Sequence, residues 1–201
     1  MKKIETIKKN IERPNGNAFG QASVKSDDDV VIVCALWTAQ TKSKKGFLKD
    51  TPPEILLSLI LKGLLSQSKI DPNLVQEVIV GNVLLPGSGA LVFRGSCLLA
   101  GLPVDTPMMT LNWFCSSGLE AISVVASKIK SGLITVGIAA GVESMSQSDM
   151  SNMVDPEKLS DEFLNNEQAA NCLLPMGITS ENVADKFGLQ RPVLDQFALE
   201  S

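Results

Sequence analysis

Residues 107–131 read PMMTLNWFCSSGLEAISVVASKIKS, and this stretch decides the fold. Its first five residues, 107–111, are mostly apolar and predict a short buried strand. Residues 115–131 predict a helix that ends at Gly132, and its apolar residues lie on nearly all sides, so we expect it to be buried between two layers. Cys115 therefore stands where a strand gives way to a helix.

Strands and helices alternate on both sides of this stretch. Apolar runs predict three further strands, at residues 30–36, 77–84 and 134–141. Two helices are predicted at residues 53–66, with Thr51 as the N-cap, and at about residues 90–100. Strands that alternate with helices are connected by right-handed crossovers. We therefore predict an α/β fold of order βαβαβαβ, with a mostly parallel sheet and helices on both faces.

The chain divides into three parts by composition. Residues 1–29 form a basic and polar tail, and residues 30–143 contain the predicted sheet. Residues 144–201 begin irregularly and then predict three helices, at about 156–171, at 180–187 with Thr179 as the N-cap, and from Pro192 to Ser201. The last helix starts close to the final residue, and the sheet lacks closing strands. This pattern indicates part of a larger design.

Composition excludes several classes of protein. The 201 residues are 44% hydrophobic with a formal net charge of −4, which argues against disorder throughout and against a nucleic-acid partner. No apolar run is long enough for a membrane span. The four cysteines have no CxxC spacing, which disfavours a metal site or a disulfide framework and favours a reducing intracellular compartment. Histidine, the commonest general base, is absent.

Cys115 is the candidate nucleophile. A thiol at a helix start faces unpaired backbone N–H groups and the positive end of the helix dipole, which favour the thiolate and suit an oxyanion. The alternative is that Cys115 only fills space, because free cysteines are commonly buried. We expect Cys34 and Cys97 to serve packing and Cys172 to have no role. The segment Gly87-Ser88-Gly89 lacks the lysine of a phosphate loop and predicts a turn.

Taken together, these segments resemble the N-terminal half of the thiolase family, from about Asp29 to Ser201. The resemblance is specific because several motifs occur in the family's order. The motifs are Val80-Gly81-Asn82-Val83-Leu84, Pro86-Gly87-Ser88-Gly89-Ala90, Asn112 with Cys115-Ser116-Ser117-Gly118-Leu119, Gly141-Val142-Glu143-Ser144-Met145-Ser146, and residues 172–184, CLLPMGITSENVA.

The resemblance implies a fold and an activity. The family fold has two similar halves stacked in five αβαβα layers, and residues 144–201 correspond to the start of its loop domain. By resemblance, Cys115 accepts the acyl group in the thiolytic cleavage of 3-ketoacyl-CoA to acetyl-CoA and a shortened acyl-CoA, a step of fatty acid β-oxidation. Coenzyme A is then a co-substrate, and no resident cofactor or metal is implied. The family's activating His and second Cys belong to the C-terminal half.

The sequence departs from the family near the chemistry. Trp113 and Phe114 replace the Arg and Gln that usually precede the cysteine, and Trp37 replaces the Arg that follows the first strand. These changes indicate a truncated or decaying copy, so we expect residues 1–201 alone to be inactive. The alternative is a non-catalytic fragment that pairs with a full-length thiolase or has no activity. A homodimer or a mixed dimer is expected. A ketoacyl synthase of the same fold is disfavoured by the motifs.

The first residues bear on localisation. Lys3-Ile4, five further residues, and then Asn10-Ile11 are similar to the family's N-terminal peroxisomal signal. That signal has His or Gln where this chain has Asn10. The resemblance implies a peroxisomal protein, with the cytoplasm as the alternative if Asn10 prevents import.

Overall fold

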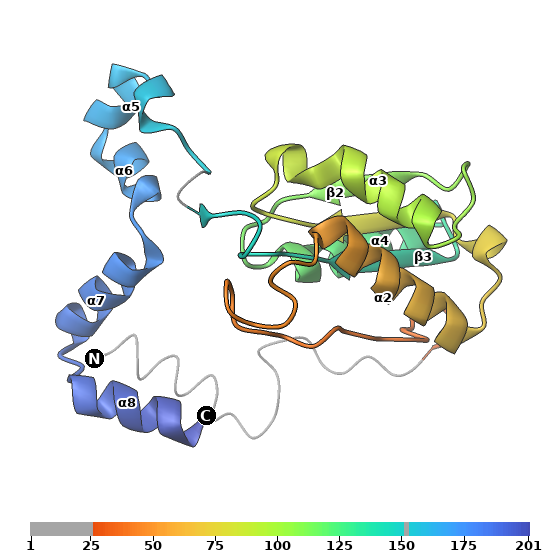
Figure 1. Cartoon of the computed structure of the whole chain (residues 1–201), viewed down its shortest axis with the longest axis horizontal. Helices are drawn as coiled ribbons and strands as arrows, with labels where there is room; N and C mark the ends of the chain where they lie inside the picture. Colours follow the sequence, from red (N-terminus) through yellow and green to blue (C-terminus); the bar gives the residue numbers. More distant parts are fainter. Residues whose placement is uncertain (1–25, 151–152) are drawn as a thin grey trace. The chain divides into compact units, whose positions relative to one another are not determined.

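The computed structural model describes residues 26–150 and 153–201 (Figure 1). The predicted basic tail and its peroxisomal signal lie outside these residues. The described residues belong to two compact units, one that runs to Val154 and one that comprises Asp155–Ser201. Each unit is considered by itself. The predicted domain boundaries at residues 29/30 and 143/144 stay predictions.

The first unit is built on a three-stranded parallel sheet. Its strands are β1 (Glu77–Gly81), β2 (Met108–Leu111) and β3 (Gly137–Gly141), in the order β2-β1-β3. In the register, Ile79 pairs with Met109 on one side and with Ala139 on the other. The predicted strands at 77–84, 107–111 and 134–141 are confirmed with shorter bounds.

Helices cover both faces of this sheet, as predicted. Helices α2 (Pro53–Ser68) and α3 (Ala90–Leu99) pack on one face, and α4 (Ser117–Lys130) packs on the other (Figure 1). Successive side chains of a strand point to opposite faces. The first core therefore contains Val78, Val80, Leu57, Leu61, Phe93 and Cys97, among others. The second contains Ile79, Ala121, Val125 and Ile134.

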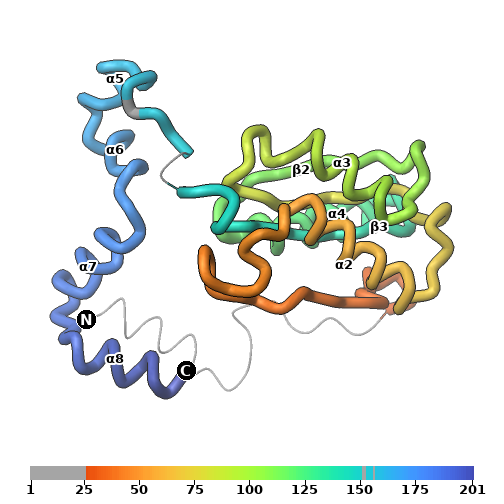
Figure 2. The backbone as a smooth tube through the Cα atoms, in the orientation of Figure 1, coloured from red at the N-terminus to blue at the C-terminus, as the bar shows by residue number. Residues whose placement is uncertain are grey.

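The predicted strand at residues 30–36 is wrong. This segment is extended but belongs to no sheet, and Val31, Ile32 and Val33 are 69%, 72% and 75% exposed. Figure 2 shows it as a long tube that runs beside α2. A β-branched run favours extended backbone, but a strand also needs a neighbouring strand with free backbone groups at hydrogen-bond distance. Residues 30–36 pair with no strand of the described sheet.

Helix α4 is covered on one face only. Ala121 and Val125 are buried against the sheet, whereas Leu119 is 70% exposed and Ile122 is also exposed. The prediction of a helix buried between two layers is therefore wrong for the described residues, because only the layer formed by the sheet is present among them. The apolar side chains that favoured burial now form an open surface.

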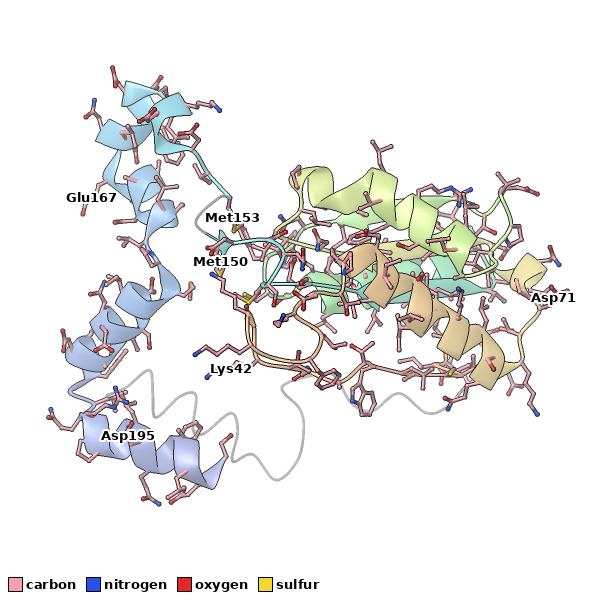
Figure 3. All side chains as sticks on the ribbon, in the orientation of Figure 1. Lys42, Asp71, Met150, Met153, Glu167 and Asp195 are labelled. Carbon is pink, nitrogen blue, oxygen red and sulfur yellow. The ribbon has the colours of Figure 1, made fainter. Side chains whose placement is uncertain are left out.

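The connections position the helices. Asp71, labelled in Figure 3, accepts a hydrogen bond from Asn73 N at 2.9 Å and starts the 3₁₀ turn η1 (Pro72–Leu74) between α2 and β1. The predicted turn at Gly87-Ser88-Gly89 is the 3₁₀ turn η2 (Pro86–Gly89). Thr51 does not cap α2, because Pro52 occupies the N-cap position and prolines begin the helix.

The second unit is helical. Its elements are η4 (Pro156–Lys158), α5 (Asp161–Asn165), α6 (Glu167–Ala170), η5 (Asn171–Leu173), α7 (Met176–Phe187) and α8 (Arg191–Glu200). One continuous helix at 156–171 was the wrong prediction, because the side chains of Ser160 and Asn166 each cap a new short helix. Thr179 lies inside α7 rather than at its start, and α8 confirms the predicted last helix. In the part of the chain described, no helix could cross a membrane.

Candidate active site

Cys115 lies exposed in the turn between β2 and α4. Phe114 before it has a left-handed backbone with φ of 49°, which a residue other than glycine adopts at a cost. Asn112 Oδ1 accepts a hydrogen bond from Phe114 N at 2.9 Å. Ser117 Oγ accepts from Trp113 N at 2.8 Å and donates to Phe114 O at 2.6 Å. Two side chains therefore hold the turn that presents the thiol.

Two glycines bring the start of α4 onto the sheet. A Cβ atom at Gly81, the last residue of β1, would lie 2.6 Å from the backbone carbon of Ser117. A Cβ atom at Gly141, the last residue of β3, would lie 3.3 Å from the Cα atom of Gly118. The close packing places the first turn of α4 over the carboxyl ends of both strands. Ligands of parallel α/β proteins bind at this edge of the sheet.

A polar network around one buried asparagine joins the loops at the same edge. Asn82, which directly follows β1, is buried and donates from Nδ2 to Val142 O at 2.8 Å and to Glu143 Oε1 at 3.0 Å. Glu143 Oε2 accepts from Val83 N at 3.0 Å and from Leu84 N at 3.3 Å. Asn82 Oδ1 accepts from Leu85 N at 3.0 Å.

The roles of Asn82, Glu143 and Ser117 were missed at the level of sequence. The sequence analysis names each of them only as part of a motif. Glu143 closely follows the predicted strand at 134–141, but Asn82 lies inside the predicted strand at 77–84, which ends at Gly81 in the structure. Polar residues that follow parallel strands meet at the carboxyl edge of the sheet, and the predicted bounds hid Asn82 from this rule. Asn82 and Glu143 join the loops that follow β1 and β3, and Ser117 holds the turn that presents the thiol.

The surroundings of Cys115 suit a nucleophile but are incomplete. The N–H groups of Ser116 and Ser117 already donate to Trp113 O and Phe114 O, at 3.1 and 3.0 Å, so any N–H group that an oxyanion uses at the start of α4 must be another one of the first turn. The neighbouring aromatic side chains, Trp113 and Phe114, are 63% and 71% exposed. The sequence has no histidine to activate the thiol.

The other cysteines occupy different environments. Cys97 is buried in α3, as expected for a packing residue, and burial raises the pKa of its thiol. Cys34 is half-buried in the extended segment rather than in a strand. Cys172 is exposed in η5, where its Sγ lies 3.6 Å from Gln168 O. Only Cys115 stands at the start of a helix beyond a parallel sheet.

The fold and the site define a class: a parallel α/β protein that presents an exposed thiol between a strand and a helix at the carboxyl edge of its sheet. The particular family follows from comparison with known proteins. The chain belongs to the thiolase family, since residues 30–201 match the model of the thiolase N-terminal domain. The fold predicted from the resemblance is confirmed.

Known thiolases are similar to this chain in sequence, and one of them is similar in structure as well. Peroxisomal 3-ketoacyl-CoA thiolase of Yarrowia lipolytica is 46% identical over 201 residues, which are all of this chain and 48% of the relative. The human peroxisomal enzyme is 42% identical over 173 residues. The dimeric peroxisomal thiolase of Saccharomyces cerevisiae superposes with a TM-score of 0.80 at 43% identity, covering 87% of this chain and 46% of the yeast chain. The chain spans about half the length of these relatives.

Proposed function

We propose that this chain is the half of a thiolase that accepts the acyl group, with Cys115 as the nucleophile. Cys115 Sγ forms a bond to the 3-keto carbon of a 3-ketoacyl-CoA, and the bond between C2 and C3 breaks. The electron pair stays on C2, which takes up a proton to give acetyl-CoA. The thiol of a second coenzyme A then attacks the acyl-Cys115 thioester, releases a shortened acyl-CoA and restores the cysteine.

The observation that supports this proposal is the position of Cys115. It is an exposed thiol at the start of α4, in a turn held by Asn112 and Ser117, within a chain whose relatives are named 3-ketoacyl-CoA thiolases. Backbone N–H groups of the first turn of α4 other than those of Ser116 and Ser117, which donate within the turn, support the oxyanion that forms at the attacked carbon. Coenzyme A enters as a co-substrate.

Two proton transfers in this scheme have no histidine to perform them in residues 1–201. One removes the proton of the Cys115 thiol, and the other delivers a proton to C2. A positioned general acid or base contributes a factor of about 10²–10⁴ to the rate. We therefore expect residues 1–201 alone to turn over little or no substrate, and we expect activity when a C-terminal thiolase half is supplied.

A complementation experiment tests this proposal. Residues 1–201 are co-expressed with the C-terminal half of the Yarrowia relative, incubated with acetyl-CoA, and analysed by mass spectrometry for acetylated cysteine. We expect acetylation at Cys115 that disappears in Cys115→Ala and persists in the matched variant Cys172→Ala, which removes the other exposed thiol. Equal labelling in Cys115→Ala would refute the assignment. Labelling of residues 1–201 alone at the rate of a complete thiolase would refute their inactivity.

A second candidate function is a non-catalytic subunit that pairs with a full-length thiolase. The observation that favours it is the open apolar surface of α4, on which Leu119 and Ile122 are exposed. The yeast structure is that of a dimeric thiolase. Co-expression of tagged residues 1–201 with the intact Yarrowia thiolase should recover a mixed dimer. Recovery of the untagged enzyme as a homodimer alone would exclude this candidate, and self-association of residues 1–201 would favour a homodimer.

We also propose that the protein acts in peroxisomes, like the relatives whose names say so. The carrier of this address would be residues 3–11. A fluorescent protein fused behind residues 1–29 should enter peroxisomes more efficiently when Asn10 is replaced by Gln, the residue of the family's signal. Equal cytoplasmic fluorescence for both versions would show that these residues do not direct import.

A further inference from the structure

Glu143 uses both of its carboxylate oxygens to hold the loop that follows β1. Its Oε1 atom accepts a hydrogen bond from Asn82 Nδ2 at 3.0 Å. Its Oε2 atom accepts from Val83 N at 3.0 Å and from Leu84 N at 3.3 Å. Glu143 itself follows β3, so one side chain joins the ends of the two paired strands β1 and β3. It is exposed and belongs to neither core cluster, so its role is not to fill space.

The orientation of the Asn82 side chain makes this arrangement specific for a carboxylate. Asn82 Oδ1 accepts a hydrogen bond from Leu85 N at 3.0 Å, and Asn82 Nδ2 also donates to Val142 O at 2.8 Å. The amide cannot turn over without losing both contacts, so it always presents a donor to Glu143. The other carboxylate oxygen faces backbone N–H donors. A glutamine at this position has one acceptor oxygen and one NH₂ donor, so in either orientation a donor would face a donor.

Two contacts connect this loop to the end of β2. Asn82 N donates to Leu111 O at 3.1 Å, and Asn112 Nδ2 donates to Val83 O at 3.5 Å. Val83 is therefore held through both of its backbone groups, because its N–H binds the carboxylate and its C=O binds the amide of Asn112. Asn112 directly follows β2 and begins the turn that presents the thiol. The loop after β1 thus fixes the first residue of that turn.

The turn is strained and depends on support of this kind. Phe114 has a left-handed backbone with φ of 49°, and a residue other than glycine keeps such a conformation only where its surroundings impose it. Asn112 Oδ1 accepts a hydrogen bond from Phe114 N at 2.9 Å. The Asn112 side chain is therefore held by the loop after β1 and in turn holds the strained residue. Cys115 comes next in the chain, so the backbone of Phe114 sets the direction in which the thiol is presented.

We infer that Glu143 is a positioning residue for Cys115, which acts through Val83 and Asn112. A misplacement of reacting atoms by about 1 Å can lower a rate by about 10²-fold, so loss of this carboxylate should slow acyl transfer while the fold persists. The part of the inference that concerns acyl transfer rests on the proposed function. The part that concerns the turn does not, and it is tested without substrate.

The first test compares Glu143→Gln with the matched control Glu54→Gln in the 201-residue chain. Both variants remove one negative charge from the first unit, but the Glu54 side chain has no hydrogen-bond partner among the described residues. Backbone amide exchange of residues 112–117 is measured by mass spectrometry. We expect it to be about tenfold faster in Glu143→Gln, because the turn opens more often, and unchanged in Glu54→Gln. Unchanged exchange in Glu143→Gln would overturn the inference.

Alkylation of Cys97 in the same samples shows whether the fold persists, because this thiol is fully buried in α3. We expect Cys97 to be alkylated as slowly in Glu143→Gln as in the natural chain. Rapid alkylation of Cys97 in this variant would mean that Glu143 holds the fold rather than the turn, and it would overturn the inference.

The second test uses residues 1–201 co-expressed with the C-terminal half of the Yarrowia relative. The rate of Cys115 acetylation is measured against the concentration of acetyl-CoA. We expect the maximal rate to fall by about tenfold or more in Glu143→Gln, with the half-saturating concentration within about twofold of the natural value. A higher half-saturating concentration with an unchanged maximal rate would assign Glu143 to substrate binding and would overturn the inference.

A double-mutant cycle tests the route through Asn112. In the Asn112→Ala background, Glu143→Gln should cause little further loss of rate, because the contact through which it acts is already absent. A full further loss would overturn the inference. If the natural chain shows no acetylation at Cys115, the proposed function fails. The exchange of residues 112–117 in Glu143→Gln then decides the inference alone.

Discussion

Gly81 lies where the carboxyl end of β1 meets the first turn of α4. An alanine there would place its Cβ atom 2.6 Å from the backbone of Ser117, which cannot move without displacing the helix that follows Cys115. Overpacking of this kind costs about 1–3 kcal/mol. We expect Gly81→Ala to lower the free energy of unfolding by that amount, as measured by urea denaturation.

Gly95 in α3 provides the matched control. A Cβ atom added there meets nothing within 4 Å, and the residue lies in a helix. Replacing a helical glycine with alanine stabilises by about 0.5–1 kcal/mol. Gly95→Ala should therefore raise the free energy of unfolding slightly. If both variants lose stability equally, the close packing at Gly81 is not the cause.

Ser117 makes a second prediction at the residue scale. Its buried hydroxyl accepts from Trp113 N and donates to Phe114 O, so Ser117→Ala leaves a backbone donor unsatisfied at a cost of about 1–3 kcal/mol. Urea denaturation should show this loss. The neighbouring Ser116 is the N-cap residue but makes no capping hydrogen bond with its side chain, so Ser116→Ala should have little effect. A larger loss for Ser116→Ala would contradict the assignment.

The sequence predicted the position of the Cys115 thiol better than it predicted the residues that hold the loops at the same edge of the sheet. Cys115 could be found because a nucleophile at a change from strand to helix is visible in sequence, and the structure places it exposed at the start of α4. Asn82 and Glu143 could not be paired in this way, because they are 61 residues apart and meet only when β1 and β3 lie side by side. Whether Cys115 is acylated remains a prediction.

At the scale of elements, sequence patterns predicted the helices whose formation depends on residues close together in the chain. Helices α2, α3 and α4 follow from apolar spacing and from the prolines and glycines at their ends. The prediction of a strand at 30–36 was wrong because a strand needs a paired neighbour, and residues 30–36 pair with no strand in the described part of the chain. The helix at 156–171 was wrong because Ser160 and Asn166 compete as caps within it.

Helix α3 makes a prediction about pH. Burial raises the pKa of the Cys97 thiol above its ordinary value of 9.0, because the thiolate is poorly solvated there. The folded chain therefore binds this proton more tightly than the unfolded chain. Its contribution to stability is complete below pH 9.0 and is lost as the pH rises through the raised value.

We expect the free energy of unfolding to fall more steeply above pH 9.0 in the natural chain than in Cys97→Ala. Urea denaturation on both sides of this pH measures the two slopes. Cys97→Ala is less stable at every pH, so the comparison uses the change with pH rather than the absolute value. Parallel curves would show that Cys97 does not titrate as burial requires.

At the scale of the whole molecule, the two units differ in how much core they contain. The sheet unit has two buried clusters, whereas among the described side chains of Asp155–Ser201 the buried one is Ala184. Isolated short helices have marginal stability in water, so little stabilises the fold of this unit. We expect its backbone amides to exchange hydrogen rapidly, whereas residues 77–81 and 137–141 should be strongly protected.

Hydrogen exchange followed by mass spectrometry measures both units in one sample. Peptides from α7 and α8 should exchange nearly as fast as the unfolded chain, and peptides from β1 should exchange slowly. Slow exchange in both units would mean that the helices of the second unit are covered by a surface in solution. Hydrogen exchange should then be compared with and without an added C-terminal thiolase half. If that half covers α7 and α8, their exchange slows when it is added.

The chain has two tryptophans and no tyrosine, and the structure places each tryptophan at a position of interest. Trp37 lines a cavity beside β3, and Trp113 lies two residues before the exposed thiol; both indoles are largely in water. Indole emission of the chain therefore comes from these two positions alone. Replacing Trp37 with Phe leaves an indole spectrum that reports the surroundings of Cys115. Replacing Trp113 with Phe leaves an indole spectrum that reports the edge of the sheet at β3. Changes at either position can therefore be followed by fluorescence without attaching a dye.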